Sequence, residues 1–371
     1  MNRTTKINNT KFNRLDLSHE ELEYYSRQIV LAELGYNAQL KLKNAKACVL
    51  GLGGLGSPVA TQLAAIGVGY LRLVDRDVVE LTNLHRQHLY GVDDVGLPKV
   101  EAATKRLLNL NPHVEIDPLP FYIAEDNAKE LVEDMDVVVD CLDRMAPRYA
   151  INRACVKLGI PYIFGAAIQT MGNVSTIIPG ETTCLECFYG DLDDSKLPTC
   201  GVVGVHPSLL AIIASIEVSE AVKILTGNKP ILTNKLLHFD ITHMDLRMVS
   251  LSKVNQCPVC GLNPSTIPKL VNRKLIEEIC GRKGKRVFVL IPRKNLNINM
   301  TLLHEYLVKK RFKIKRKGSL GISFDKDTQV TVNILKSGIM IVEGFKEKQD
   351  TLTFFHETFV DGLGISKELI S

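Results

Sequence analysis

The chain has 371 residues, of which 45% are hydrophobic, and its formal net charge is +5. This length exceeds one ordinary domain and the apolar content is ample for packed cores, so we expect two folded units. No apolar run approaches the length of a membrane span and the N-terminus lacks the apolar segment of a signal peptide, so we expect a cytoplasmic protein without a membrane partner. Nine cysteines, four of them in CxxC pairs, favour metal binding or thiol chemistry over a disulfide framework.

Residues 1–17 are predicted to form a basic, flexible tail, because residues 1–14 contain four Lys or Arg side chains and no acid. Ser18, with glutamates closely following it, predicts the start of a helix. Arg27 lies on the continuation of this segment beside apolar residues. From the pattern alone, Arg27 is expected to form a surface ion pair.

Residues 47–75 predict a strand, a glycine turn, a helix and a second strand. The turn contains Gly51, Gly53, Gly54 and Gly56, in the GxGxxG spacing of nucleotide sites. Glycines allow close backbone approach, and the N-terminus of the helix expected at 59–66 offers free N–H groups to an anion. Asp75 ends the second strand about 20 residues further on, where a carboxylate accepts hydrogen bonds from ribose hydroxyls. We therefore expect a bound nucleotide.

Three polar side chains follow in the next loop: Asn83, Arg86 and Lys99. They suit a polyphosphate, because Arg binds phosphate through a planar fork and Lys acts as a mobile point charge. Hydride transfer does not require an amide, a guanidinium and an ammonium group in one loop. A nicotinamide-dependent dehydrogenase, which the glycine motif alone would allow, is therefore the less favoured alternative. Taken singly, each cation is also compatible with a solvated loop charge.

An apolar run, Val137–Cys141, is typical of a parallel strand buried on both faces. Asp143 follows this strand. Since ligands of open α/β sheets bind outside the carboxyl ends of the strands, Asp143 is placed to bind Mg²⁺ together with substrate phosphates. It is also placed to cap the helix expected at 147–157, and the two roles are compatible.

The remaining elements of this part complete a Rossmann-like α/β fold with a mostly parallel sheet. They are helices at 98–110, 128–133 and 207–225, and strands at 114–118, 162–164, 174–178, 236–240 and 244–251.

Two CxxC pairs, Cys184/Cys187 and Cys257/Cys260, match the four thiolates of a structural zinc site. The long gap between the pairs implies that the metal joins two segments distant in sequence. Unrelated redox CxxC motifs are the alternative.

Cys200 belongs to neither pair and precedes a long helix. A helix N-terminus lowers a thiol pKa and makes the thiol more nucleophilic, whereas many free cysteines are inert core residues. Both roles stay open for Cys200. Cys48, Cys141, Cys155 and Cys280 lie in apolar contexts and are expected to pack in the core.

Residues 262–371 differ in composition, with 21 Lys and Arg against 11 Asp and Glu. The pattern predicts a small basic α+β domain after a linker at 263–268. Its expected helices are 272–280, 300–311 and 348–359, and its expected strands are 286–292, 312–316, 319–324, 329–334 and 338–343. Phe312 and Ile314 alternate with cations, which indicates a solvated basic face or a docking surface for an acidic protein. A docking surface for RNA is the less favoured alternative.

Residues 17–261 resemble the adenylyltransferases of the ThiF, MoeB and HesA type, which activate ubiquitin-like sulfur carriers in molybdopterin and thiamine biosynthesis and share the adenylation fold of ubiquitin-activating enzymes. The resemblance rests on motifs that occur together and in the same order. They are Tyr25–Ile29, Gly51–Gly56, Asp75, Asn83–Gln87, Gly96–Lys99, Asp140–Asp143, Gly165–Ala167, Cys184/Cys187, Thr199–Cys200 and Cys257/Cys260. Arg144 departs from the family, which usually has Asn after the metal-binding Asp.

The resemblance implies a reaction in which ATP adenylates the C-terminal Gly-Gly carboxylate of a ubiquitin-like sulfur carrier and pyrophosphate leaves. It further implies that residues 18–261 form the adenylation domain, with Zn²⁺ structural and Mg²⁺ catalytic. Asp75 would then hold the ribose, Asn83, Arg86 and Lys99 the phosphates, and Asp143 the Mg²⁺. Arg27 would reach the neighbouring site of a homodimer.

Two other functions remain open at this point. One is activation of a ubiquitin-like modifier for protein conjugation through a Cys200 thioester. The resemblance leaves the role of Cys200 open, because the thiamine enzyme has a sulfur-handling cysteine there and the molybdopterin enzyme has a cysteine that it does not need. The other is a non-catalytic scaffold that binds the carrier, which Arg144 and the unfamiliar residues 262–371 make conceivable. For residues 262–371 we expect a role in carrier docking or in dimer support.

Overall fold

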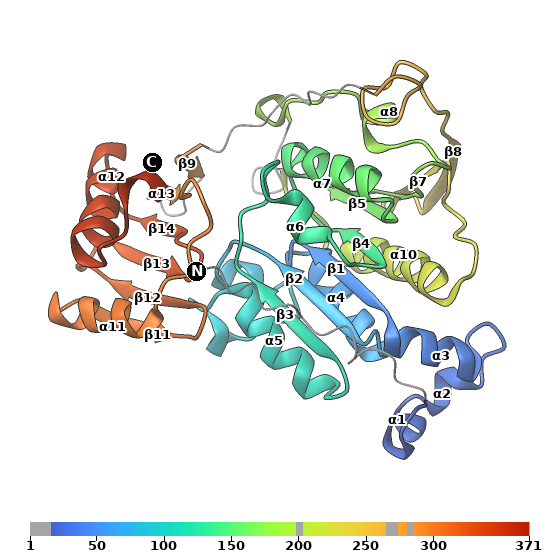
Figure 1. Cartoon of the computed structure of the whole chain (residues 1–371), viewed down its shortest axis with the longest axis horizontal. Helices are drawn as coiled ribbons and strands as arrows, with labels where there is room; N and C mark the ends of the chain where they lie inside the picture. Colours follow the sequence, from blue (N-terminus) through green and yellow to red (C-terminus); the bar gives the residue numbers. More distant parts are fainter. Residues whose placement is uncertain (1–15, 198–202, 265–273, 280–284, 371) are drawn as a thin grey trace.

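The fold is described from a computed structural model, which describes residues 16–197, 203–264, 274–279 and 285–370. The described chain forms two units, each built on its own sheet (Figure 1). We call residues 16–264 the first unit and residues 274–370 the second unit. None of the described helices is long and apolar enough to cross a membrane.

The first unit contains an eight-stranded sheet in the order β3-β2-β1-β4-β5-β6-β7-β8. The strands β3, β2, β1, β4 and β5 are parallel to one another. Each of β6, β7 and β8 runs antiparallel to the strand before it in this order. The strands are β1 (Lys46–Leu50), β2 (Tyr70–Val74), β3 (Glu115–Leu119), β4 (Val137–Asp140), β5 (Tyr162–Ile168), β6 (Met171–Ile177), β7 (Lys235–Asp240) and β8 (Asp245–Ser250). The predicted α/β fold with a mostly parallel sheet is confirmed.

Helices cover both faces of this sheet because its central strands are apolar throughout. Val49 and Leu71 pack with α4, α5 and α10 on one face, while Cys48 and Val138 pack with α6 and α7 on the other. The helices are α1 (His19–Tyr24), α2 (Ser26–Ile29), α3 (Gly35–Asn44), α4 (Gly56–Ile66), α5 (Lys99–Leu110), α6 (Ala128–Val132), α7 (Met145–Leu158), α8 (Leu185–Tyr189) and α10 (Pro207–Thr226). Short 3₁₀ turns lie at Leu81–Asn83, Val92–Asp94 and Asp194–Lys196.

A buried ion pair fixes the carboxyl end of β4. Arg148 on α7 donates to Asp140 Oδ2 at 2.9 Å and to the carbonyl oxygen of Gly165 on β5 at 2.8 Å. Arg148 also donates to the Leu142 carbonyl, and the Tyr162 hydroxyl donates to Asp140. Both ions therefore have several partners, which is the condition under which a buried pair holds a structure together.

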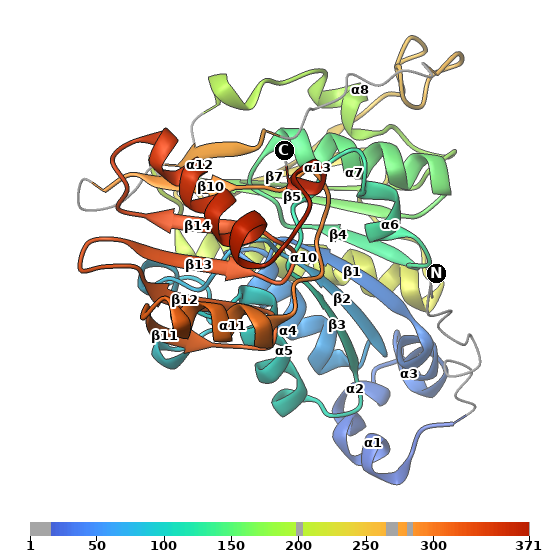
Figure 2. The same ribbon diagram turned by 60° about the vertical axis from the view of Figure 1, so that its left-hand side comes forward.

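The second unit contains a six-stranded sheet in the order β11-β12-β13-β14-β10-β9, and every pair in it is antiparallel. Its elements are β9 (Ile276–Ile279), β10 (Val287–Leu290), α11 (Met300–Lys309), β11 (Lys313–Lys317), β12 (Gly321–Asp325), β13 (Thr331–Leu335), β14 (Met340–Glu343), α12 (Lys348–His356), a π-helical turn (Glu357–Gly362) and α13 (Lys367–Ile370). Figure 2 shows α11 and α12 in front of this sheet.

The two faces of the second sheet have different partners. Met340 and Val342 of β14 face the core that contains α11 and α12, while Ile341 between them packs in a separate cluster with Val78 of the first unit. The Ser337 hydroxyl donates to the Pro120 carbonyl oxygen at 2.5 Å. One face of the sheet is thus closed by its own helices and the other by the first unit.

The predicted helix at 272–280 is wrong: residues 276–279 form strand β9, and the rest of that range lies mostly outside the described residues. Glu and Leu are good helix formers, so the local sequence favours a helix. Pairing with β10 overrides this preference, and it directs Glu277 and Glu278 to opposite faces of the sheet. The predicted tail at 1–17 lies almost wholly outside the described residues, and the division at 261/262 stays a prediction.

The buried Glu217 on α10 makes the stability of the fold depend on pH. The side chain is fully buried, and its Oε2 has no hydrogen-bond partner among the described residues. Burial, with Asp140 nearby, raises the pKa of Glu217 well above 4.5. The folded protein therefore keeps a proton that the unfolded chain loses, so stability falls as the pH rises above about 4.5.

We expect Glu217→Gln, which has the same shape and no proton to lose, to gain stability relative to the wild type as the pH rises. Urea denaturation of both proteins at pH 5 and pH 8 measures this difference. The midpoint of the variant should exceed that of the wild type by more at pH 8 than at pH 5. A constant difference would contradict the protonated state of Glu217.

Candidate active site

The glycine turn joins the carboxyl end of β1 to the first turn of α4. Gly51 has φ +82°, and its N–H donates to the Val74 carbonyl oxygen at 2.8 Å. A Cβ on Gly56 would lie 1.7 Å from the carbonyl oxygen of Gly51. No other residue fits at Gly56 without moving the backbone, so glycine at this position is what allows the chain to pass so closely from β1 into α4.

Asp75 lies directly beside this turn, at the end of β2. Its carboxylate accepts hydrogen bonds from the backbone N–H of Leu52 at 2.7 Å and of Asp77 at 2.8 Å. The residue is buried, and burial raises the pKa of the carboxyl. Asp75 is therefore held rigidly where a Rossmann-like fold binds ribose.

Lys99, the first residue of α5, reaches the same place. Its ammonium lies 3.1 Å from Asp77 and 3.9 Å from Asp75. Burial works to lower the pKa of Lys99, but the two carboxylates outweigh burial and raise it. The structure thus brings Asp75 and Lys99 together, and it adds Asp77, which the sequence reasoning missed.

The loop with Asn83 and Arg86 is tied to the glycine turn. The Tyr90 hydroxyl donates to the Leu52 carbonyl oxygen at 2.9 Å, and the Leu89 N–H donates to the Ser57 hydroxyl at 2.9 Å. Asn83 is buried and accepts a hydrogen bond from the Glu80 N–H, while Arg86 donates to the Thr82 carbonyl oxygen at 2.9 Å. In this structure, Asn83 and Arg86 organise their own loop.

Asp143 is exposed after β4, and it is not the cap of α7. The two carboxylate oxygens of Asp194 accept hydrogen bonds from the N–H groups of Met145 at 2.6 Å and Ala146 at 2.9 Å. Asp194 lies about 50 residues away in sequence and fills the capping role that the sequence offered to Asp143. The oxygens of the Asp143 carboxylate are thereby left for another ligand. The negative charge of Asp143 also helps to raise the pKa of Lys99.

Arg27 lies far from these residues of its own chain. The neighbouring Gln28 donates to the carbonyl oxygen of Ile66, the last residue of α4. Since α4 begins at the glycine turn, its end marks the opposite edge of the sheet. Figure 1 accordingly places α1, α2 and α3 at the other end of the molecule from the second unit.

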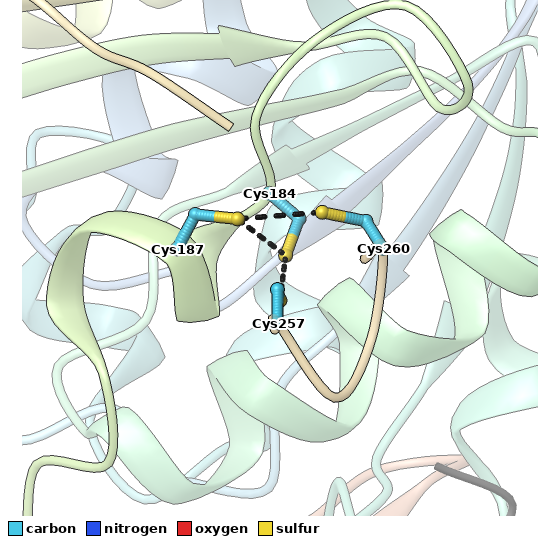
Figure 3. A group of neighbouring side chains, drawn as sticks. All are labelled: Cys184, Cys187, Cys257 and Cys260. Atoms are coloured by element: carbon cyan, nitrogen blue, oxygen red, sulfur yellow. Dashed lines mark hydrogen bonds between the residues drawn. The ribbon is translucent and has the colours of Figure 1, made fainter. Parts of the chain in front are cut away.

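The four predicted zinc ligands come together (Figure 3). The thiol sulfurs of Cys184, Cys187, Cys257 and Cys260 all lie within 4.8 Å of one another. Tetrahedral zinc with bonds of about 2.3 Å places its sulfurs about 3.8 Å apart. The distances of 3.6 Å from Cys184 to Cys257 and 3.3 Å from Cys187 to Cys260 are close to that value. The donor set and its geometry therefore fit zinc.

The environment of Cys187 favours a thiolate. Burial opposes ionisation of this thiol, but hydrogen bonds, first among them one from the Val254 backbone, outweigh burial and lower its pKa to about 6. Metal ligands of this type must be deprotonated. Cys200 lies outside the described residues. Cys48, Cys141 and Cys155 are buried in the core, as expected, whereas Cys280 is outside the described part.

Comparison with known proteins places these features in a family. Residues 25–259 match the model of the ThiF family. The chain is 38% identical over 270 residues to the sulfur carrier protein adenylyltransferase of Thermus thermophilus, an alignment that covers 71% of this chain and 97% of the relative. It is also 38% identical over 270 residues to the adenylyltransferase and sulfurtransferase MOCS3 of Culex quinquefasciatus, which covers 72% of this chain. The chain spans only 61% of that mosquito protein.

Among solved structures, the fold is similar to that of Escherichia coli MccB crystallised with ATP. The TM-score is 0.57 and the sequence identity is 27%, over 64% of this chain and 74% of MccB. The similarity therefore covers a part of the chain about as long as the first unit.

Removing one zinc ligand tests the metal site. We expect Cys257→Ala to reduce the bound zinc from about one atom per chain to less than about a tenth, because three thiolates hold zinc far more weakly than four. The melting temperature should fall as well, since the metal joins two distant segments. Plasma emission spectrometry of the dialysed protein measures the zinc. Cys155→Ala, which removes a buried thiol outside the cluster, is the control; equal zinc in both variants would contradict the assignment.

Proposed function

This chain belongs to the ThiF family, and on that premise we propose that it uses ATP to adenylate the C-terminal Gly-Gly carboxylate of a ubiquitin-like sulfur-carrier protein. The observation that supports this proposal best is the convergence of Asp75, Lys99, Asp143 and the glycine turn at one edge of the sheet. The adenylyltransferase name of the Thermus thermophilus relative, over nearly its whole length, agrees with it.

The proposed reaction forms one bond and breaks another at the α-phosphorus of ATP. A carboxylate oxygen of the carrier attacks this phosphorus, the bond to the oxygen that bridges to the β-phosphate breaks, and pyrophosphate leaves with the bonding electrons. The carboxylate is already ionised, so the step needs no general base. Catalysis then consists of positioning and of neutralising the charge that develops on pyrophosphate.

Asp75 is proposed to hold the ribose, because its carboxylate is fixed by two backbone N–H groups beside the glycine turn. Lys99 is proposed to bind the phosphates. Its ammonium is kept charged by Asp75 and Asp77 in the absence of nucleotide. We assign Asn83 and Arg86 to the phosphates as well, on the strength of the family motif and of the ties between their loop and the glycine turn.

Asp143 is proposed to hold Mg²⁺ together with the phosphates of ATP. The residues fit such an ion, since the carboxylate is exposed at the carboxyl end of β4 and Asp194 has taken over the cap of α7. Mg²⁺, when bound, supplies further positive charge to the phosphates.

Arg27 is proposed to act in the site of a second copy of the chain. It is exposed on α2, at the opposite edge of the sheet from its own glycine turn. In a symmetric dimer, each subunit would then complete the site of its partner. Residues 18–261 are proposed as the adenylation domain that forms this dimer.

ATP–pyrophosphate exchange with Gly-Gly-ending carriers from the same genome tests the reaction. We expect exchange with one carrier, and we expect Asp143→Ala to reduce it at least about 100-fold, because the variant loses charge stabilisation of the leaving group. Asp93→Ala removes an exposed carboxylate from the 3₁₀ turn at Val92–Asp94 and should leave exchange unchanged. Exchange that is absent with every carrier would rule out the proposed reaction, and exchange that is equal in both variants would rule out the role of Asp143.

Mixing two inactive variants tests the role of Arg27. We expect Arg27→Ala and Asp143→Ala to be inactive separately. Mixed dimers would contain one site with both intact residues, so an equal mixture after subunit exchange should regain about a quarter of wild-type exchange. No recovery in a mixture that mass spectrometry shows to contain mixed dimers would place Arg27 outside the neighbouring site.

A further inference from the structure

The second unit inserts one carboxylate into the edge of the first unit where the nucleotide is proposed to bind. Glu277 Oε2 accepts hydrogen bonds from Arg76 at 2.9 Å and from Arg144 at 3.2 Å. The Tyr122 hydroxyl donates to Glu277 Oε1 at 3.4 Å. The Glu277 side chain is only 11% exposed, so this bridge is largely withdrawn from water.

The three partners of Glu277 follow three different parallel strands. Arg76 follows β2, Tyr122 follows β3 and Arg144 follows β4. Strands β2 and β4 are the two neighbours of β1, which ends in the glycine turn. The carboxylate of Glu277 therefore joins the loops on either side of the nucleotide-binding turn.

Arg76 links this bridge to Asp75, its neighbour in sequence. The Arg76 guanidinium lies over the Tyr122 ring, 4.9 Å from the ring centre. Burial disfavours its charge, but Glu277 and Asp77 hold the pKa of Arg76 above its ordinary value. Arg76 is therefore a buried cation whose charge is balanced by Glu277 and Asp77, and Glu277 is the carboxylate that accepts its hydrogen bond.

Glu277 is held firmly in this position by the rest of the second unit. The apolar cluster of Val78 with Val289, Ile339 and Ile341 lies on the same face of the second sheet. The carboxylate of Glu101 accepts hydrogen bonds from the Ser319 and Leu320 N–H groups at 2.6 and 2.9 Å. Because the interface is packed and hydrogen-bonded, we expect it to hold the Glu277 carboxylate in one position.

We propose that Glu277 is a positioning residue of the nucleotide site, through which the second unit completes that site. By pairing with Arg76 and Arg144, it keeps the Asp75 carboxylate available to the ribose and holds the loops after β2 and β4 at a fixed separation. The inference rests on the proposed function only in taking the glycine turn and Asp75 as the site of ATP. The second unit thereby becomes part of the ATP-binding machinery, in addition to any role in docking the carrier.

The neighbouring Glu278 offers a matched control. It lies on the same strand but faces the other side of the sheet, where it is exposed and pairs with Arg286 at 2.7 Å within the second unit. Glu277→Gln and Glu278→Gln thus remove the same charge from adjacent positions, and only Glu277 contacts the first unit.

The first measurement is the affinity for a non-hydrolysable ATP analogue with Mg²⁺, by calorimetry on the full chain. We expect Glu277→Gln to weaken binding about tenfold, because Arg76 then competes with the ribose for Asp75, and Glu278→Gln to bind within about twofold of wild type. In exchange assays, the KM for ATP should rise in Glu277→Gln while kcat and the KM for the carrier stay unchanged.

A double variant separates this role from a purely structural one. In Arg76→Gln/Glu277→Gln the unpaired guanidinium is gone, so the affinity should return to within about threefold of wild type. Loss of structure at the interface would instead make the double variant at least as poor as the single one. Urea denaturation of each variant verifies that it is folded.

Nucleotide affinity in Glu277→Gln that equals or exceeds wild type would overturn the inference, as would a double variant no better than the single one. A wild-type chain that binds no ATP analogue would overturn it together with the proposed function. A wild-type chain that binds the analogue but adenylates no carrier would overturn the proposed function alone, since the binding comparison would still decide the role of Glu277.

Discussion

The buried contact between Arg148 and Asp140 is the constraint on which the candidate site depends. It joins the end of β4 to the Gly165 carbonyl of β5 and to α7. Because both ions are buried, losing either partner would leave an uncompensated charge in the core. The end of β4 is thus held in place by Arg148. The loop that follows, with Asp143 and Arg144, therefore begins at a fixed position at the carboxyl end of the sheet.

Two carboxylates from distant segments then determine what these emerging residues can do. Asp194 caps α7 and so relieves Asp143 of that role. Glu277 pairs with Arg144 and with Arg76, the residue after Asp75. Arg144, at the position where the resemblance implies asparagine, adds a cation beside Asp143. In this chain the second unit supplies the carboxylate that balances this charge.

The first unit was largely predictable because its signals are local. The apolar run Val137–Cys141, the glycines from Gly51 to Gly56 and the CxxC pairs each indicate a structure through residue type and spacing alone. Strand β9 was not predictable in the same way. Residues 276–279 favour a helix locally, and their strand depends on β10 and on arginines some 130 and 200 residues earlier. The importance of Glu277 was hidden for the same reason.

The sequence by itself determined the Rossmann-like fold, the glycine turn with Asp75, and the four thiols of the metal site, since each depends on short-range pattern and on side-chain chemistry. Only the tertiary structure decided which carboxylate caps α7, that Asp77 shares Lys99 with Asp75, and that the second unit contacts the loops after β2 and β4 through Glu277. These facts are pairings of charges between segments far apart in the chain. No local pattern records such pairings, because they arise only when the two sheets pack together and bury the charges in one place.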